Sequence, residues 1–225
     1  MPGVTLRAQA EELLHQRCFF LFMALLALLI STPFLSETAG GRWIITLANV
    51  AVLVSAVAAV GRTKFSFVIA FILAMPALVF RLLSVDGSSP GYITLAWGCN
   101  ALFYVFVLAN LLNYVLRRDV MTADKLYGAV AAYVLIAICW AFLHGVLQYF
   151  YPGAYALGGT LKALDMGELI YFSFTALSTT GFGDITPLLI QSRFLTILEM
   201  VTGVMYIAIL IARLTGVYPV VAKKP

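Results

Sequence analysis

Six long apolar runs follow one another along the chain, and short polar connections separate most of them. The runs cover residues 18–35, 43–60, 65–83, 92–116, 126–150 and 194–217. A run of about 20 apolar residues is long enough to cross the hydrocarbon core of a membrane as a helix. The pattern therefore predicts an all-α membrane protein with six transmembrane helices.

The one long connection lies between the fifth and sixth runs and has a pattern of its own. Within it, Asp165 is followed three residues later by Glu168, a spacing typical of a helix start. The apolar segment 169–178 that follows is too short to cross a membrane and fits a re-entrant helix. It ends near Gly181 and Gly183, and glycine permits unusual backbone angles. Because irregular backbone persists at membrane depth only inside protein or beside a water-filled path, this region predicts a pore.

Composition and charge support a membrane protein and set its orientation. The chain is 63% hydrophobic and 11% charged, whereas soluble domains are about 45–50% apolar and about 25% charged. Ten of the 14 Lys and Arg residues fall on the side that holds both termini, and cytoplasmic segments are enriched in these residues. We therefore expect both termini in the cytoplasm. The net charge of +4 then reflects topology, so no nucleic-acid partner is expected.

The pattern divides the chain into five segments. We expect a cytoplasmic N-terminal arm at 1–17, a four-helix collar at 18–116, a cytoplasmic linker at 117–125, a pore domain at 126–217 and a short cytoplasmic tail at 218–225. The collar occupies the position of a voltage sensor, but its fourth run has no Lys or Arg, whereas a sensor needs several. Strong voltage gating is therefore not expected. The short loops favour a prokaryotic inner membrane.

The sequence Thr-Thr-Gly-Phe-Gly-Asp at 179–184 resembles the selectivity filter of the potassium channel family, Thr-Val-Gly-Tyr-Gly-Asp. The resemblance extends over residues 165–217, about a quarter of the chain. It implies that K⁺ ions, the only cofactor expected, bind in the filter. The residues that it assigns to ion binding are Thr179, Thr180, Gly181, Phe182 and Gly183, with Asp184 at the filter mouth. Since each chain carries one filter, four chains are needed to surround an ion, and a homotetramer in a lipid bilayer follows.

The filter departs from the family pattern in three places. Thr180 stands where the family usually has Val or Ile, and Phe182 replaces Tyr. Thr175, a candidate for filter support, lacks the carboxyl group that some members place behind the filter. A weakly selective monovalent cation channel of the same fold is therefore the nearest alternative. A potassium uptake subunit is a further one, although such proteins usually carry four filter repeats in one chain.

Two residues of the last run are candidates for gating or filter support. Glu199 is an ionisable residue within a predicted span, which by default suggests a function. We expect Glu199 behind the filter, hydrogen-bonded to the re-entrant helix (the pore helix). The alternatives are that Glu199 faces the cavity or forms an ion pair with Arg193. Gly203 follows Gly183 by twenty residues, where family members often carry a hinge glycine. A small residue for helix packing is the other interpretation.

Nothing in the chain has the pattern of an enzyme. The predicted spans hold no paired aspartates, no Ser–His pair and no His-rich cluster. Neither histidine, His15 nor His144, has a carboxylate or a second histidine at a useful spacing. The three cysteines do not have metal-ligand spacing.

Overall fold

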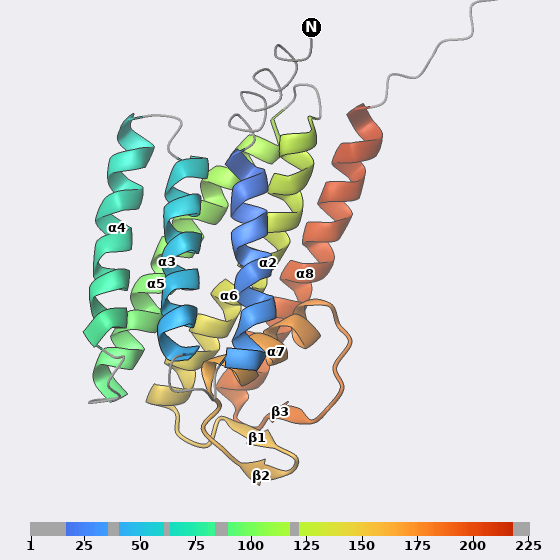
Figure 1. Ribbon diagram of the computed structural model, residues 1–225. Coiled ribbons are helices and arrows are strands. Elements are labelled where there is room, and N and C mark those ends of the chain that lie inside the picture. Colours follow the sequence, from blue (N-terminus) through green and yellow to red (C-terminus); the bar gives the residue numbers. More distant parts are fainter. Residues whose placement is uncertain (1–16, 36–40, 61–63, 84–89, 118–121, 218–225) are drawn as a thin grey trace, which may run out of the picture.

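The computed structural model describes residues 17–35, 41–60, 64–83, 90–117 and 122–217. The helices are α2 (Arg17–Leu35), α3 (Gly41–Val60), α4 (Lys64–Leu83), α5 (Pro90–Val115), α6 (Ala123–Phe150), α7 (Met166–Leu177) and α8 (Ile190–Val217). Figure 1 shows the long helices side by side, with α7 and a small sheet at one end and the end of α8 at the other. The predicted tail, nearly all of the arm and most of the linker lie outside the described residues.

Each of the six apolar runs corresponds to one helix, so the largely helical fold is confirmed. Among the described residues, α2, α5, α6 and α8 are long and apolar enough to cross a membrane. The apolar parts of α3 and α4 are shorter, at Ile44–Ala59 and Phe65–Phe80. An integral membrane protein is supported, while the number of six spans stays a prediction.

Helix α6 packs against α2 and α5 on one side and against α7 and α8 on the other. The main buried cluster joins side chains of α2, α3, α5 and α6, including Leu25, Val52, Phe103, Leu135 and Ile138. Small residues bring α6 close to its neighbours: a Cβ built on Gly145 would lie 2.6 Å from Cε3 of Trp97 on α5. Within lipid, such close van der Waals packing is a main source of helix association.

Asp124 ties three helices together at the end opposite the sheet. Its Oδ1 accepts a hydrogen bond from the backbone N–H of Cys18 at 2.9 Å, and its Oδ2 accepts one from the Tyr114 hydroxyl at 2.8 Å. The first N–H groups of a helix lack partners within it, so the carboxylate satisfies a group at the start of α2. The starts of α2 and α6 and the end of α5 are thereby held together.

A three-stranded antiparallel sheet was not predicted from the sequence. Its strands are β1 (Tyr155–Leu157), β2 (Thr160–Leu161) and β3 (Ile185–Pro187), in the order β2-β1-β3. Gly158 and Gly159 connect β1 to β2 with φ values of 57° and 83°, as a two-residue type I′ hairpin turn requires. Since β3 directly follows the filter sequence, the sheet joins the two sides of the long connection.

Candidate functional site

The short helix α7 begins where the sequence predicted. The Asp165 carboxylate accepts a hydrogen bond from the Glu168 N–H at 2.9 Å, and the Glu168 carboxylate accepts one from the Asp165 N–H at 3.0 Å. Glu168 also bonds Lys162 Nζ at 2.5 Å, which raises the pKa of Lys162. Burial works against ionisation of Glu168, but its hydrogen bonds with Lys162 and Asp165 lower its pKa overall. The cap fixes the direction of α7, whose C-terminal end faces the filter sequence.

The backbone of the filter sequence alternates in handedness. Thr179, Gly181 and Gly183 have φ values of 58°, 52° and 80°, whereas Thr180 and Phe182 have negative φ. Alternation of this kind lets successive carbonyl groups point to one side of the chain. Among the described residues, Thr179 is the sole non-glycine with positive φ. Such a conformation costs on the order of 1–3 kcal/mol, which makes the segment a functional candidate.

The first three N–H groups of this loop have hydrogen-bond acceptors, whereas the carbonyl oxygens of residues 179–182 accept no hydrogen bond in the described part of the chain. The N–H groups of Thr180 and Gly181 both donate to the Thr175 carbonyl oxygen, at 2.9 and 3.2 Å, and the Thr179 N–H donates to Ala176. The carbonyl oxygens of residues 179–182 could therefore act as cation ligands. Thr175 supports the loop through its carbonyl group, while its hydroxyl bonds Phe172 in its own helix.

The Thr180 hydroxyl has a partner at the end of α7. It lies 2.8 Å from the Ser178 hydroxyl, which in turn donates to the Phe174 carbonyl oxygen at 2.7 Å. Because the Ser178 hydrogen is used in that second bond, Thr180 is the donor in the first. The hydroxyl that distinguishes Thr180 from valine thus anchors the loop to α7.

Asp184 lies where the loop meets the sheet. Its carbonyl oxygen accepts a hydrogen bond from the Gly158 N–H at 2.8 Å, and its carboxylate accepts one from the Ile185 N–H at 3.0 Å. The Tyr171 hydroxyl on α7 interacts with the same carboxylate, which raises the pKa of Tyr171. The Tyr171 ring also stacks on Phe182, with ring centroids 6.3 Å apart. Sequence reasoning missed Tyr171 because an aromatic residue in an apolar helix carries no special signal.

Glu199 lies in the interior, between α8, α6 and α7. Its side chain is fully buried, and its Oε2 lies 2.9 Å from Nε2 of His144 on α6. The other ring nitrogen of His144 lies 2.6 Å from the hydroxyl of Tyr155 on β1. Arg193, the alternative ion-pair partner, donates instead to the Pro187 carbonyl oxygen at 3.3 Å. The sequence did not reveal His144 as a partner because 55 residues separate it from Glu199.

Gly203 lies at the point where α8 approaches the end of α7. A Cβ built on it would lie 2.0 Å from the Leu177 carbonyl oxygen and 2.9 Å from the carbonyl carbon. Such contacts do not occur in folded proteins, so only glycine fits this crossing without a shift of backbone. The structure thus assigns a packing role to Gly203, while a hinge role stays a prediction.

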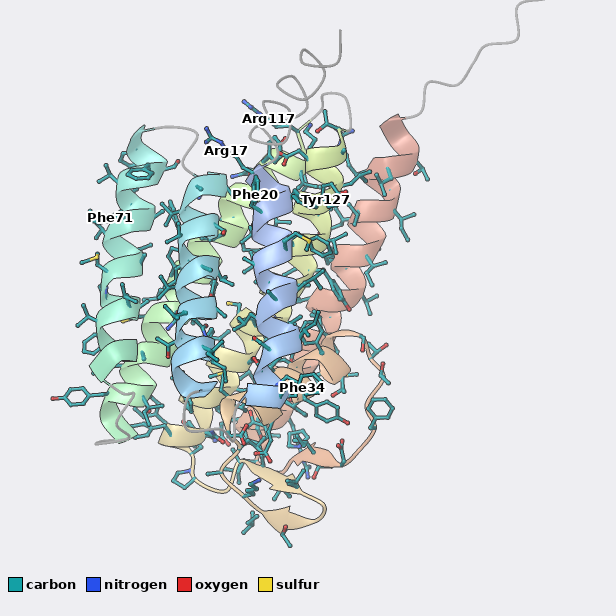
Figure 2. All side chains as sticks on the ribbon, viewed as in Figure 1. Arg17, Phe20, Phe34, Phe71, Arg117 and Tyr127 are labelled. Carbon is teal, nitrogen blue, oxygen red and sulfur yellow. The ribbon has the colours of Figure 1, made fainter. Side chains whose placement is uncertain are left out.

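Apolar side chains are exposed on several of the long helices in the single chain, and α8 carries many of them. The filter residues 179–184 are exposed in the single chain. Much of α8 is exposed with them (Figure 2), including Ile197, Leu198, Val201, Val204, Met205 and Ile211. Large contiguous apolar patches mark contacts with protein or membrane.

Residues 135–218 match the model of a family described as ion channels. The match includes most of α6, the sheet, α7, the filter loop and α8. No curated protein and no solved structure matches the chain. The family match supports an ion-channel domain in this part of the chain, and it points to a transport protein of the membrane, not to an enzyme.

Proposed function

We propose that the protein is a potassium-selective channel through which K⁺ moves passively along a central pore. The observation that carries this proposal is the filter loop, where φ alternates in sign and the carbonyl oxygens of residues 179–182 accept no hydrogen bond in the described part of the chain. Rings of backbone carbonyls are how potassium filters replace the water around the ion. The ion-channel match over the same region supports this function.

The residues assigned to ion binding are those that the sequence suggested. Carbonyl groups of Thr179, Thr180, Gly181 and Phe182 bind the ion in this proposal, with Gly183 and Asp184 forming the outer mouth. Helix α7 adds a favourable field, because the C-terminal end of a helix carries a partial negative charge. It ends at Leu177, two residues before Thr179.

The proposed channel is a homotetramer. One loop offers ligands from one direction only, and the exposed filter and apolar α8 face would be covered by neighbouring copies. We expect the protein in mild detergent to have four times the chain mass of 24.5 kDa by native mass spectrometry. Monomers or dimers alone, under conditions that preserve conduction, would contradict the assembly.

In each proposed subunit the collar packs on the pore helices of its own chain. The segment between Val115 at the end of α5 and Ala123 at the start of α6 is short, and an extended chain spans at most about 3.6 Å per residue. The Asp124 hydrogen bonds hold these ends together. We place this end in the cytoplasm, where labelling of an introduced cysteine should occur only from the inner side.

Two alternatives use the same site. A weakly selective cation channel would share the fold and the pore, and Thr180 is the residue that keeps this alternative open. A potassium uptake subunit is less well supported because the chain carries a single filter sequence. Measured selectivity and passive current distinguish all three.

The central experiment measures bi-ionic reversal potentials with K⁺ on one side and Na⁺ on the other. We expect K⁺ preference in the natural protein and a smaller preference in Thr180→Val. The variant loses the hydrogen bond to Ser178, and such a bond contributes about 0.5–1.5 kcal/mol. A change of up to about tenfold in the permeability ratio follows. The same recordings should show only weak voltage dependence, since α5 has no Lys or Arg.

Ser178→Ala is the matched control, because it removes the other partner of the same bond. The two single variants should shift selectivity alike, and the double variant should add little, as expected for residues that act through one contact. Equal permeability to both ions in the natural protein would overturn K⁺ selectivity and favour the weakly selective channel.

A further inference from the structure

A row of buried polar side chains connects the outer sheet to α8. Tyr155 on β1, His144 on α6 and Glu199 on α8 are each at most 1% exposed. The Tyr155 hydroxyl lies 2.6 Å from His144 Nδ1, and His144 Nε2 lies 2.9 Å from Glu199 Oε2. This triad, Tyr155–His144–Glu199, joins α6 and the neighbouring strand β1 to α8, which is 55 residues further along the chain from His144.

One arrangement of hydrogens that satisfies the contacts places a neutral imidazole beside an ionised carboxyl group. In that state the Tyr155 hydroxyl donates to His144 Nδ1, and His144 Nε2–H donates to Glu199, so every hydrogen of the row has an acceptor. A second proton on the ring would make Nδ1 a donor as well, and the Tyr155 hydrogen would then need a new acceptor. The row therefore has two protonation states, which differ by one buried charge.

The surroundings of the triad offer little compensation for a negative Glu199. On α7, the Ser173 hydroxyl lies beside the carboxyl group as a neutral hydrogen-bond partner, so it supplies no counter-charge. The Phe172 ring meets the His144 ring edge-on, with centroids 5.1 Å apart, and the Cys139 thiol on α6 is a further titratable group near Glu199. Among the described residues, no Lys or Arg forms a salt bridge with the triad. A buried charge without a counter-charge is costly.

A cavity lies next to the Tyr155 end of the triad. It has a volume of about 370 Å³ and lies between the outer ends of α5 and α6 and the hairpin. Its lining includes Trp97, Gln148 and Tyr155. Tyr155 therefore belongs both to the wall of this cavity and to the hydrogen-bonded row that reaches Glu199.

We propose that the triad is a proton-binding site, reached from the outer solution past Tyr155, whose protonation disfavours cations in the filter. The inference rests on the proposed cation pore, because ions in that pore supply the counter-charge that a negative Glu199 lacks. Binding of the proton cancels the net negative charge of the triad behind α7. Cations are then held less well in the filter, and the channel is open less often. By linkage, cations in the filter must weaken proton binding by the same factor.

The test is single-channel recording with the pH and K⁺ concentration of the outer solution varied. Lowering the outer pH from 8 to 5 should reduce the open probability about tenfold, with a single midpoint. Higher outer K⁺ should move the midpoint to lower pH. Glu199→Gln, which lacks the charge at every pH, should lower the open probability at pH 8 and flatten the pH dependence.

His144→Gln provides the sharpest comparison, since glutamine keeps hydrogen-bonding capacity without titrating in this range. It should abolish the pH dependence. Glu168→Gln is the matched control: glutamine preserves the capping position, and the lowered pKa of Glu168 keeps it from titrating here. This control should keep the natural midpoint.

A second measurement uses the natural protein, so it tests the proposal even where the variants fail to assemble. The chain has two histidines, so imidazole NMR of the natural protein should show a second titration besides that of His15, with a K⁺-dependent midpoint. The proposal is overturned if His144→Gln keeps the natural pH dependence, or if no histidine midpoint responds to K⁺. Absence of current at pH 8 would instead contradict the pore itself.

Discussion

Replacing Gly203 by alanine is expected to abolish conduction and to prevent stable assembly. The new methyl group would lie 2.0 Å from the Leu177 carbonyl oxygen, so α8 must move away from the end of α7. Overpacking typically costs about 1–3 kcal/mol. Here the cost should reach or exceed the upper end, because the opposing atoms belong to the backbone and cannot rotate away. Tetramer yield and K⁺ flux in vesicles measure the effect.

Gly98→Ala is the matched control for this change. Gly98 also lies in a long helix, α5, but a Cβ built on it meets no atom within 4 Å. The control should assemble and conduct like the natural protein. Normal assembly and flux in Gly203→Ala would show that α8 does not pack against Leu177 as closely as described.

The second large effect is expected for Gly181→Ala, which should eliminate K⁺ conduction while leaving the fold intact. No atom of the same chain lies within 4 Å of the added Cβ, so crowding within the chain is not the cause. The cause is the backbone, because Gly181 has a φ of 52° and an L-residue there costs about 1–2 kcal/mol. That strain would be repeated in four copies around one ion path. Flux assays on purified tetramers provide the measurement.

Gly159→Ala is the control that distinguishes backbone strain in the proposed filter from backbone strain elsewhere in the chain. Gly159 has a φ of 83° with equally open surroundings, but it lies in the hairpin turn between β1 and β2. This variant should lose some thermal stability and still conduct. If both variants conduct equally well, the backbone at 181 is not part of the ion path.

The helices of the fold were predictable because their signals are local. Apolar runs of membrane-spanning length predicted all the long helices, and a helix satisfies its own backbone hydrogen bonds within the run. The cap at Asp165 and Glu168 was equally visible, since both partners lie within one turn. The irregular loop at 179–184 was predictable as well, because the positive φ angles of Gly181 and Gly183 depend on residue type at fixed positions.

Contacts between distant segments were decided only by the tertiary structure. Glu199 and His144 meet across 55 residues, and no spacing rule connects residues on two different long helices. The pairing of β1 with β3 escaped notice because each strand has three residues. The close packing of Gly203 on Leu177 was one of two open interpretations. In a membrane protein, residues that face lipid and residues that face other helices are both apolar, so the sequence by itself could not say which side of each helix is buried.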